Sequence, residues 1–157
     1  MKGLIEVGTG RDLVTGESLG GWRWLGLLGL SELRSLKYAD DVVDGVARVI
    51  KPFGSIPRPR IPKGWHAHHL VEKRFWRQLG FSSAEEGMDK ILAAMIPDGI
   101  HLGEITPQLR RLIPNTETAT LQEIWDAHKQ VYSQYEWGED WLDAIWKEYF
   151  AGKDVVR

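Results

Sequence analysis

The chain contains no cysteine among its 157 residues. This absence excludes disulfides, cysteine-ligated zinc and thiol nucleophiles, and it is compatible with either an oxidising or a reducing compartment. The sequence also lacks an uncharged apolar run of the roughly eighteen residues that a membrane-spanning helix requires. Its first residues lack the apolar centre of a secretory signal. The sequence therefore predicts no membrane association.

The chain also has little net charge. Its 20 lysines and arginines and 22 aspartates and glutamates give a formal net charge of −2 at pH 7. The balance argues against nucleic-acid binding, but the two signs are segregated. Residues 51–77 contain seven basic residues and one acid, whereas residues 117–157 contain nine acids and four basic residues. A basic segment of this kind favours a phosphodiester ligand, although many chains of this size show some segregation of charge.

Histidine is the residue type that points to chemistry. His66, His68 and His69 lie within four positions, and His101 follows further along the chain. Imidazole is the commonest metal ligand and a natural general base near neutral pH. Adjacent histidines on an extended strand point to opposite faces. One of the pair could therefore hold a cation while the other activates water, as a hydrolytic metal site requires. We interpret His66 as an exposed strand residue.

The apolar pattern predicts a mostly helical α+β chain in three parts. A hydrophobic content of 43% and eight tryptophans indicate a packed globule. Residues 1–50 are expected to be helical, with a short helix near 18–30 and an amphipathic helix over 35–50. Four prolines within 51–62 predict an extended linker. The domain that carries the histidines is expected to occupy residues 63–157.

Within that domain, loose alternation predicts a strand over 65–71, and a short helix is expected over 73–79. The apolar run 91–96 fits either a buried strand or the end of a helix. Residues 83–86 look like a capped helix start. Thr106 and Pro107 fit the cap and first position of a further helix.

Two aromatic-rich stripes, over 121–135 and 141–150, predict a C-terminal pair of helices. Both stripes are expected to form core, with no cofactor role. His128 lies on the first stripe, and we interpret it as a hydrogen-bonded core residue rather than a metal ligand.

Residues 66–75 read His-Ala-His-His-Leu-Val-Glu-Lys-Arg-Phe. This run resembles the HHxxEKRF signature of toxin nucleases in the HNH/endonuclease VII (His-Me finger) superfamily. Downstream elements of that superfamily have counterparts here at 96–101, 112–114 and 122–125. The resemblance covers roughly residues 64–150. It implies a ββα-metal finger packed against the C-terminal helical pair.

The N-terminal part carries a second resemblance. Residues 9–19 are similar to the TG-containing segment that precedes toxin domains in bacterial polymorphic toxins, and residues 39–44 are typical of the linkers there. Residues 1–50 would then be a helical pre-toxin segment. This resemblance implies a module of a larger secreted bacterial toxin, which acts in the cytoplasm of a target cell and is neutralised by an immunity protein.

The resemblance also implies catalytic roles for both members of the histidine pair. In the family pattern the first histidine binds metal and the second is the base. His68 and His101 would therefore hold one divalent metal ion (Mg, Mn or Zn), and His69 would deprotonate the attacking water. Some relatives carry a second histidine four residues after the helix histidine, where this chain has Ile105.

That departure leaves the ligand set incomplete. Water, phosphate oxygens or a carboxylate such as Glu72 or Glu104 would have to complete it, and oxygen ligands suit Mg²⁺ or Mn²⁺ as readily as Zn²⁺. The basic residues Lys73, Arg74 and Arg77 would bind the phosphate backbone of DNA, or of RNA, without sequence readout.

The sequence leaves two alternatives open. The chain could be a non-catalytic helical interaction module whose histidines bind a structural metal or none. It could also be a metal-dependent hydrolase of another substrate, such as cell-wall peptide. Zinc peptidases usually carry HExxH or HxxEH helices, and neither pattern occurs here.

Overall fold

The computed structural model describes residues 40–57, 61–82 and 87–157. The segment similar to pre-toxins, the helix expected near 18–30 and the helix start at 83–86 lie outside these ranges. Within them the prediction of a mostly helical α+β chain is confirmed. In the described part of the chain, no helix is long and apolar enough to cross a membrane.

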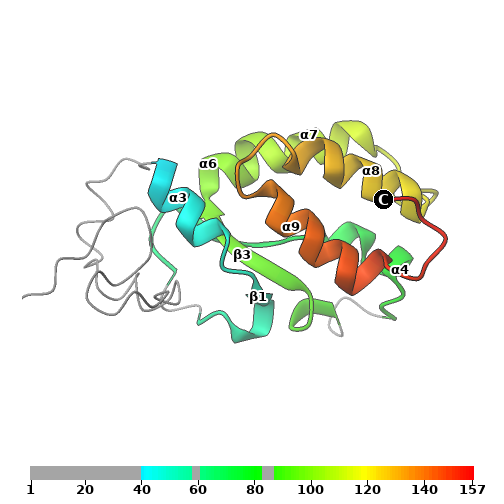
Figure 1. Ribbon diagram of the computed structural model, residues 1–157, viewed down its shortest axis with the longest axis horizontal. Helices are drawn as coiled ribbons and strands as arrows, with labels where there is room; N and C mark the ends of the chain where they lie inside the picture. Colours follow the sequence, from blue (N-terminus) through cyan, green and yellow to red (C-terminus); the bar gives the residue numbers. More distant parts are fainter. Residues whose placement is uncertain (1–39, 58–60, 83–86) are drawn as a thin grey trace, which may run out of the picture.

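A three-stranded antiparallel sheet lies at the centre of the fold, with the order β1-β3-β2 (Figure 1). The strands are β1 (Lys51–Pro52), β2 (Trp65–His69) and β3 (Leu92–Pro97). The run predicted as a strand or a helix end is therefore the central strand. Its burial from Ala93 to Pro97 explains why its sequence is continuously apolar.

The beginning of the expected linker belongs to this sheet. Lys51 pairs with Ala93, and Pro52 pairs with Leu92. Pro52 lacks an N–H group, which an edge strand tolerates. The short 3₁₀ helix η1 (Phe53–Ser55) follows directly.

Helices cover both faces of the sheet. Helix α3 (Asp40–Ala47) packs through Val42, Val43 and Val46 on the face that also carries Trp65 and Met95. The C-terminal helices cover the opposite face. Helix α3 also contacts these helices directly, because the Trp141 indole donates to the Ala47 carbonyl oxygen at 2.8 Å. Segment 40–57 therefore packs with the rest of the described chain.

After β2 the chain forms the 3₁₀ helix η3 (Lys73–Phe75) and helix α4 (Trp76–Leu79). Gly80 ends α4 with a φ of 100°, a left-handed conformation that favours glycine. The short helix expected over 73–79 is confirmed.

One helical run follows β3, made of α6 (Asp98–Ile100), the π-helical turn η4 (His101–Ile105) and α7 (Thr106–Leu112). The predicted helix start at Thr106 is therefore wrong, because the run begins at Asp98. The Thr106 N–H bonds to the His101 carbonyl five residues earlier. This wide turn lies directly before Pro107, whose ring and missing N–H disrupt a regular helix interior.

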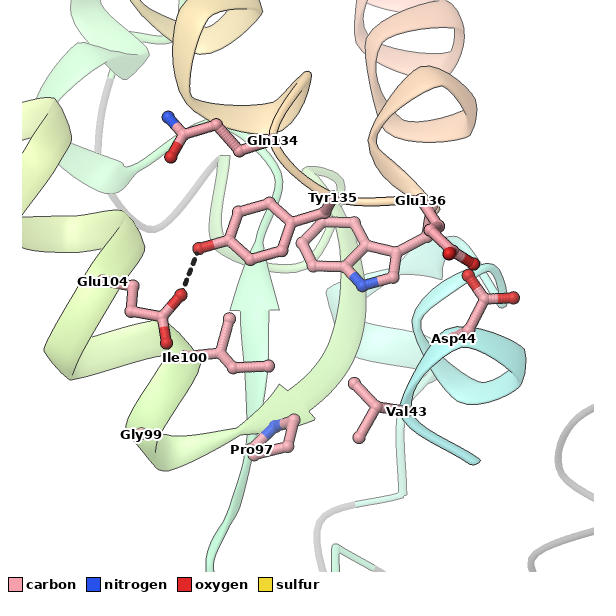
Figure 2. A pocket seen from close by; sticks show the side chains of 10 residues that line it. Val43, Asp44, Pro97, Gly99, Ile100, Glu104, Gln134, Tyr135 and Glu136 are labelled. Carbon is pink, nitrogen blue, oxygen red and sulfur yellow. Dashed lines mark hydrogen bonds between the residues drawn. The ribbon is translucent and has the colours of Figure 1, made fainter. Parts of the chain in front are cut away.

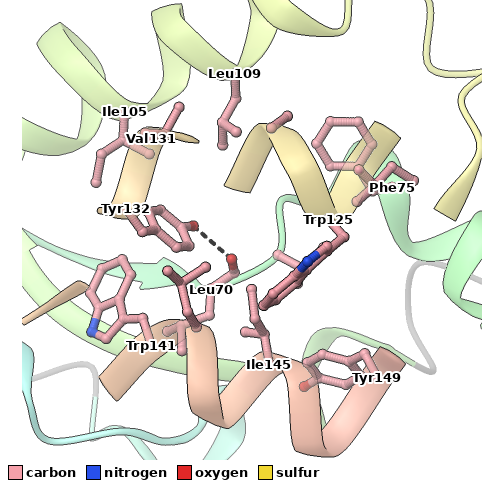
Figure 3. Packing of buried hydrophobic residues seen from close by; sticks show 14 of the residues in the cluster. Leu70, Phe75, Ile105, Leu109, Trp125, Val131, Tyr132, Trp141, Ile145 and Tyr149 are labelled. Atoms are coloured by element: carbon pink, nitrogen blue, oxygen red, sulfur yellow. Dashed lines mark hydrogen bonds between the residues drawn. The ribbon is translucent and has the colours of Figure 1, made fainter. Parts of the chain in front are cut away.

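The C-terminal pair consists of α8 (Leu121–Tyr132) and α9 (Gly138–Ile145), which continues as the π-helical turn η5 (Trp146–Phe150). Thr120 and Glu123 form a capping box at the start of α8. Figure 3 shows the aromatic side chains between the two helices, and the prediction that both stripes are core is confirmed. His128 is buried, with Nδ1 at 2.6 Å from the Ile124 carbonyl oxygen, as expected of a hydrogen-bonded core residue.

Gly138 allows the tight connection between α8 and α9. A Cβ atom at this position would overlap the Tyr132 carbonyl oxygen. Gly138→Ala should therefore lower the free energy of unfolding by about 2–4 kcal/mol in urea denaturation. The control is Gly45→Ala in α3, where an added Cβ meets nothing within 4 Å. That change should be neutral or stabilise the protein by about 0.5–1 kcal/mol. Equal effects of the two changes would contradict this account.

Candidate active site around the histidine cluster

Strand pairing brings the four histidines together. The end of β3 at Pro97 lies opposite Trp65 at the start of β2. The helical run that follows places the His101 ring 4.6 Å from that of His68 and 4.7 Å from that of His66, measured between ring centres. Residues far apart in the sequence therefore share one site.

The two faces of β2 give the adjacent histidines different surroundings. His68 stacks on Trp141 of α9, with ring centres 5.4 Å apart. His69 stacks instead on Phe53 of η1, at 4.1 Å. The expectation that adjacent histidines point to opposite faces is confirmed. Both rings nevertheless line the same pocket at the end of the strand.

His68 is held in one tautomer by a buried hydrogen-bond chain. The Tyr132 hydroxyl donates its only proton to the Leu70 carbonyl oxygen at 2.6 Å, as Figure 3 shows. Its oxygen lies 3.1 Å from His68 Nε2 and can only accept there. His68 Nε2 therefore carries the proton, and Nδ1 presents a lone pair. Burial raises the pKa of Tyr132 well above its usual value, so the hydroxyl stays protonated.

The lone pair of His68 points at His101. The two Nδ1 atoms lie 2.9 Å apart. Burial lowers the pKa of His68 well below its usual value, and the nearby His101 lowers it further. Burial also lowers the pKa of His101, followed by the effect of His66. Both imidazoles are therefore neutral near neutral pH, which is the form that binds a metal.

The separation of the two nitrogens fits a shared cation. Bonds of about 2.1 Å to one Zn²⁺ ion place two nitrogens about 3.0 Å apart in octahedral and about 3.4 Å apart in tetrahedral geometry. The observed 2.9 Å is close to the first value. A direct N–H···N hydrogen bond has the same length, so the distance permits a cation without requiring one.

His69 is also neutral at pH 7. Burial lowers its pKa to about 4, and a hydrogen bond with the backbone of Met88 acts in the opposite direction. Its Nε2 atom is buried and has no hydrogen-bond partner. A buried polar atom without a partner is uncommon in a folded protein. A neutral imidazole can accept a proton from water, but Nε2 is shielded from solvent in this arrangement, so a water could reach it only after the ring turns toward the pocket.

The pocket around the histidines has a volume of about 580 Å³. It contains most of the predicted site residues, together with some that were not assigned to the site from the sequence. The predicted residues are His68, His69, Glu72, Lys73, Arg74 and His101, and the additional polar residues are His66, Thr106 and Arg110.

The basic residues near this pocket differ in their solvent exposure and in their hydrogen-bond partners. Lys73 and Arg110 are exposed. Arg74 is anchored, because it pairs with Glu72 at 2.7 Å and donates to the Ile113 carbonyl oxygen at 2.8 Å. Its Nη2 atom is buried without a partner. Arg77 is exposed and is not one of the residues that line the pocket.

Only one of the two suggested carboxylate ligands lies at the histidines. Glu72 lines the pocket and raises the pKa of His101 by its charge, against the larger effect of burial. Glu104 accepts a hydrogen bond from Tyr135 at 2.8 Å in a separate pocket beside α3 (Figure 2). Across residues 40–57, 61–82 and 87–157, no three side chains of the ligand types are placed to hold one ion as they stand.

His66 has more contacts than an exposed strand residue needs. Its side chain is about half exposed, as expected. Its Nδ1 atom lies 3.0 Å from Asp98 Oδ1, at the start of the helical run that also carries His101.

Comparison with known protein families, curated proteins and solved structures finds no match for the chain.

Proposed function

We propose that the chain is a metal-dependent endonuclease that hydrolyses phosphodiester bonds, with DNA as the favoured substrate and RNA as the alternative. The observation that carries the proposal is that His68 and His69 line one pocket but lie on opposite faces of β2. His68 directs a lone pair at His101. His69 has an unpartnered buried nitrogen. A ligand pair beside a base is the arrangement that metal-assisted hydrolysis uses.

The order of elements supports a ββα-metal finger. Strands β2 and β3 pair antiparallel, and the helical run from Asp98 follows β3 directly. The histidine pair lies on the first strand, and His101 lies on the helix, within a π-helical turn. Turns of this kind occur frequently at functional sites.

In the proposed mechanism His68 and His101 would hold the divalent ion, and Glu72, which lines the same pocket, could add an oxygen ligand. The bound ion would stabilise the charge that develops on the phosphate and the leaving oxygen. His69, neutral near pH 7, would accept the proton of the attacking water at Nε2 once its ring turns toward the pocket. Tyr132 keeps His68 in the tautomer that leaves Nδ1 free.

Lys73 and Arg110 are proposed to hold the phosphate backbone. Both are exposed at the pocket rim, whereas Arg74 is tied to Glu72 and to a backbone carbonyl. The remaining Nη2 group of Arg74 has no partner but is shielded from solvent, so it could reach a phosphate only after the side chain shifts. Arg77 would contact phosphates further from the reacting bond.

The biological setting is proposed from the sequence resemblance. The chain would act as the toxic module of a larger secreted bacterial protein in the cytoplasm of a target cell. An immunity protein would protect the producer. An acidic inhibitor that covers the basic segment 51–77 would suit this role.

The experiment that tests the proposal incubates the full chain with plasmid DNA and with total RNA. Each substrate is exposed to Mg²⁺, Mn²⁺ or Zn²⁺, and to a chelator. Cleavage with at least one ion, abolished by the chelator, supports the nuclease. Metal binding without cleavage of either substrate would favour the non-catalytic module instead.

Replacing Lys73 and Arg110 together by alanine should weaken DNA binding and reduce its salt dependence. Each phosphate contact contributes about 0.9 to the slope of log affinity against log salt concentration, so the slope should fall by about two. Fluorescence anisotropy with a labelled duplex across a salt series measures it. Arg77→Ala is the comparison, and it should change the slope by at most one. An unchanged slope in the double variant would place the binding surface elsewhere.

The pH dependence of cleavage should reflect the low pKa of His69. A base is active when deprotonated, so the rate should rise with pH through about 4 and stay level up to neutral pH. Single-turnover rates between pH 3.5 and 7.5 measure this, with circular dichroism at each pH to confirm folding. A rate that falls as the pH drops through about 6.5 would indicate a solvated base instead.

A further inference from the structure

His66 lies beside the His68–His101 pair, on the side of the cluster where a third protein ligand could join them. His66 and His68 are two residues apart on β2, so they share one face of the sheet. The His101 ring lies close to both of them. We propose that His66, oriented by Asp98, is the third protein ligand of the ion held by His68 and His101, and that the site selects zinc-like transition metals over Mg²⁺. This inference rests on the proposed function only in taking a cation at the His68–His101 pair.

The ring centres already lie at about the separation of two imidazoles on one ion, and the His66 ring must still turn to direct a nitrogen at it. For two imidazoles on one Zn²⁺ ion with bonds of about 2.1 Å, the ring centres lie about 4.6 Å apart in octahedral and about 5.3 Å apart in tetrahedral geometry. The observed separations are 4.6 Å for His68 with His101 and 4.7 Å for His66 with His101.

Asp98 prepares His66 for ligation. An ionised carboxylate only accepts hydrogen bonds, so His66 Nδ1, at 3.0 Å from Asp98 Oδ1, carries the proton. Nε2 is then left with the lone pair. Metal-binding histidines usually donate their other N–H to a carboxylate or a carbonyl in this way. The backbone of Asp98 is itself fixed, because its N–H donates to the Gly64 carbonyl oxygen at 2.9 Å.

Stability does not account for the pairing of His66 with Asp98. Their side chains are 51% and 44% exposed, and a pair with this exposure contributes little to folding. The same exposure lets the His66 ring rotate without disturbing the core. This rotation is needed, since the described part of the chain has no preformed group of three ligands.

The ligand chemistry determines which ions the site takes. Three imidazole nitrogens suit Zn²⁺, Co²⁺, Ni²⁺ and Cu²⁺, whereas Mg²⁺ prefers oxygen ligands and keeps several waters. The third ligand therefore changes the expected cofactor from any of Mg, Mn and Zn to the zinc-like group.

The test is a metal titration of the full chain without nucleic acid. Zn²⁺ affinity is measured by competition with a chromophoric chelator, and Co²⁺ coordination by visible absorption. Asp98→Asn should weaken Zn²⁺ binding by about 10–100-fold. His66→Ala should weaken it at least as much and change the Co²⁺ spectrum. The matched control is Asp143→Asn, an exposed carboxylate paired with Arg157, which should leave both unchanged.

Three results would overturn the inference: no Zn²⁺ binding by the unaltered chain, unchanged Zn²⁺ affinity and Co²⁺ spectrum in His66→Ala, or tighter binding of Mg²⁺ than of Zn²⁺. Its failure is distinguishable from failure of the nuclease proposal. Zinc binding that depends on His66 without nucleic-acid cleavage would contradict only the nuclease. Metal-dependent cleavage with no role for His66 in metal binding would contradict only the third ligand.

Discussion

His69→Ala is expected to reduce the rate of phosphodiester cleavage by about 10²–10⁴-fold, the usual contribution of a general base. The metal affinity should stay close to that of the unaltered chain, because His69 faces Phe53 and Trp76 rather than His101. Single-turnover cleavage and calorimetric metal titration of the same preparation measure both quantities.

His128→Gln is the matched control for this change. His128 is also buried, with a pKa lowered by burial to about 4, but it is not one of the residues that line the pocket. Its replacement should lower stability and leave the cleavage rate of the folded fraction within a few-fold. A His69→Ala variant that has lost its metal but cleaves normally once metal is restored would reverse the assigned roles.

His68→Ala should lower both metal affinity and turnover, and a high metal concentration should partly restore turnover. His68 is 1% exposed and stacks on Trp141, so the variant also leaves a cavity, and its fold must be checked by thermal unfolding. Calorimetry gives the affinity, and cleavage across a metal series gives the recovery. Unchanged metal affinity in a folded variant would remove His68 from the ligand set.

Tyr132→Phe tests the role of His68 as a metal ligand while leaving the His68 side chain in place. The ring would still pack between α8 and α9, but His68 Nε2 would lose its acceptor. Loss of such a partner typically reduces metal affinity by about 10–100-fold. Tyr149→Phe is the control, because its hydroxyl accepts a hydrogen bond from the Leu92 N–H instead. Equal effects of the two changes would indicate a general loss of stability.

Local pattern was enough to predict the elements that carry the site. The alternation around His68 predicted β2, and the aromatic stripes predicted α8 and α9, because each pattern reports burial within one element. Local pattern could not separate a strand from a helix end over 91–96. Pairing with β1 and β2, which both precede β3 in the chain, settles that choice, and such long-range pairing leaves no local signal.

The partners that sequence reasoning missed come from distant elements. Tyr132 was assigned to the core by its place on the stripe, and it is core, but its hydroxyl also reaches His68. Phe53 was part of the expected linker, and it stacks on His69 because β1 joins the sheet. Arg110 lies nine residues after His101 on the same helical run. A helix expected to begin at Thr106 gave no reason to place Arg110 at the histidines.

The measurement that tests the central claim most directly is plasmid cleavage by the purified full chain under reversible metal removal, beside a His68→Ala/His101→Ala variant. The account predicts that the unaltered chain cuts the plasmid, stops when a chelator is added and resumes when excess divalent ion is restored. The folded double variant should stay inactive throughout. Cleavage that persists in the chelator, or cleavage by the folded double variant at the unaltered rate, would contradict the claim that this histidine pocket is a metal-dependent nuclease site.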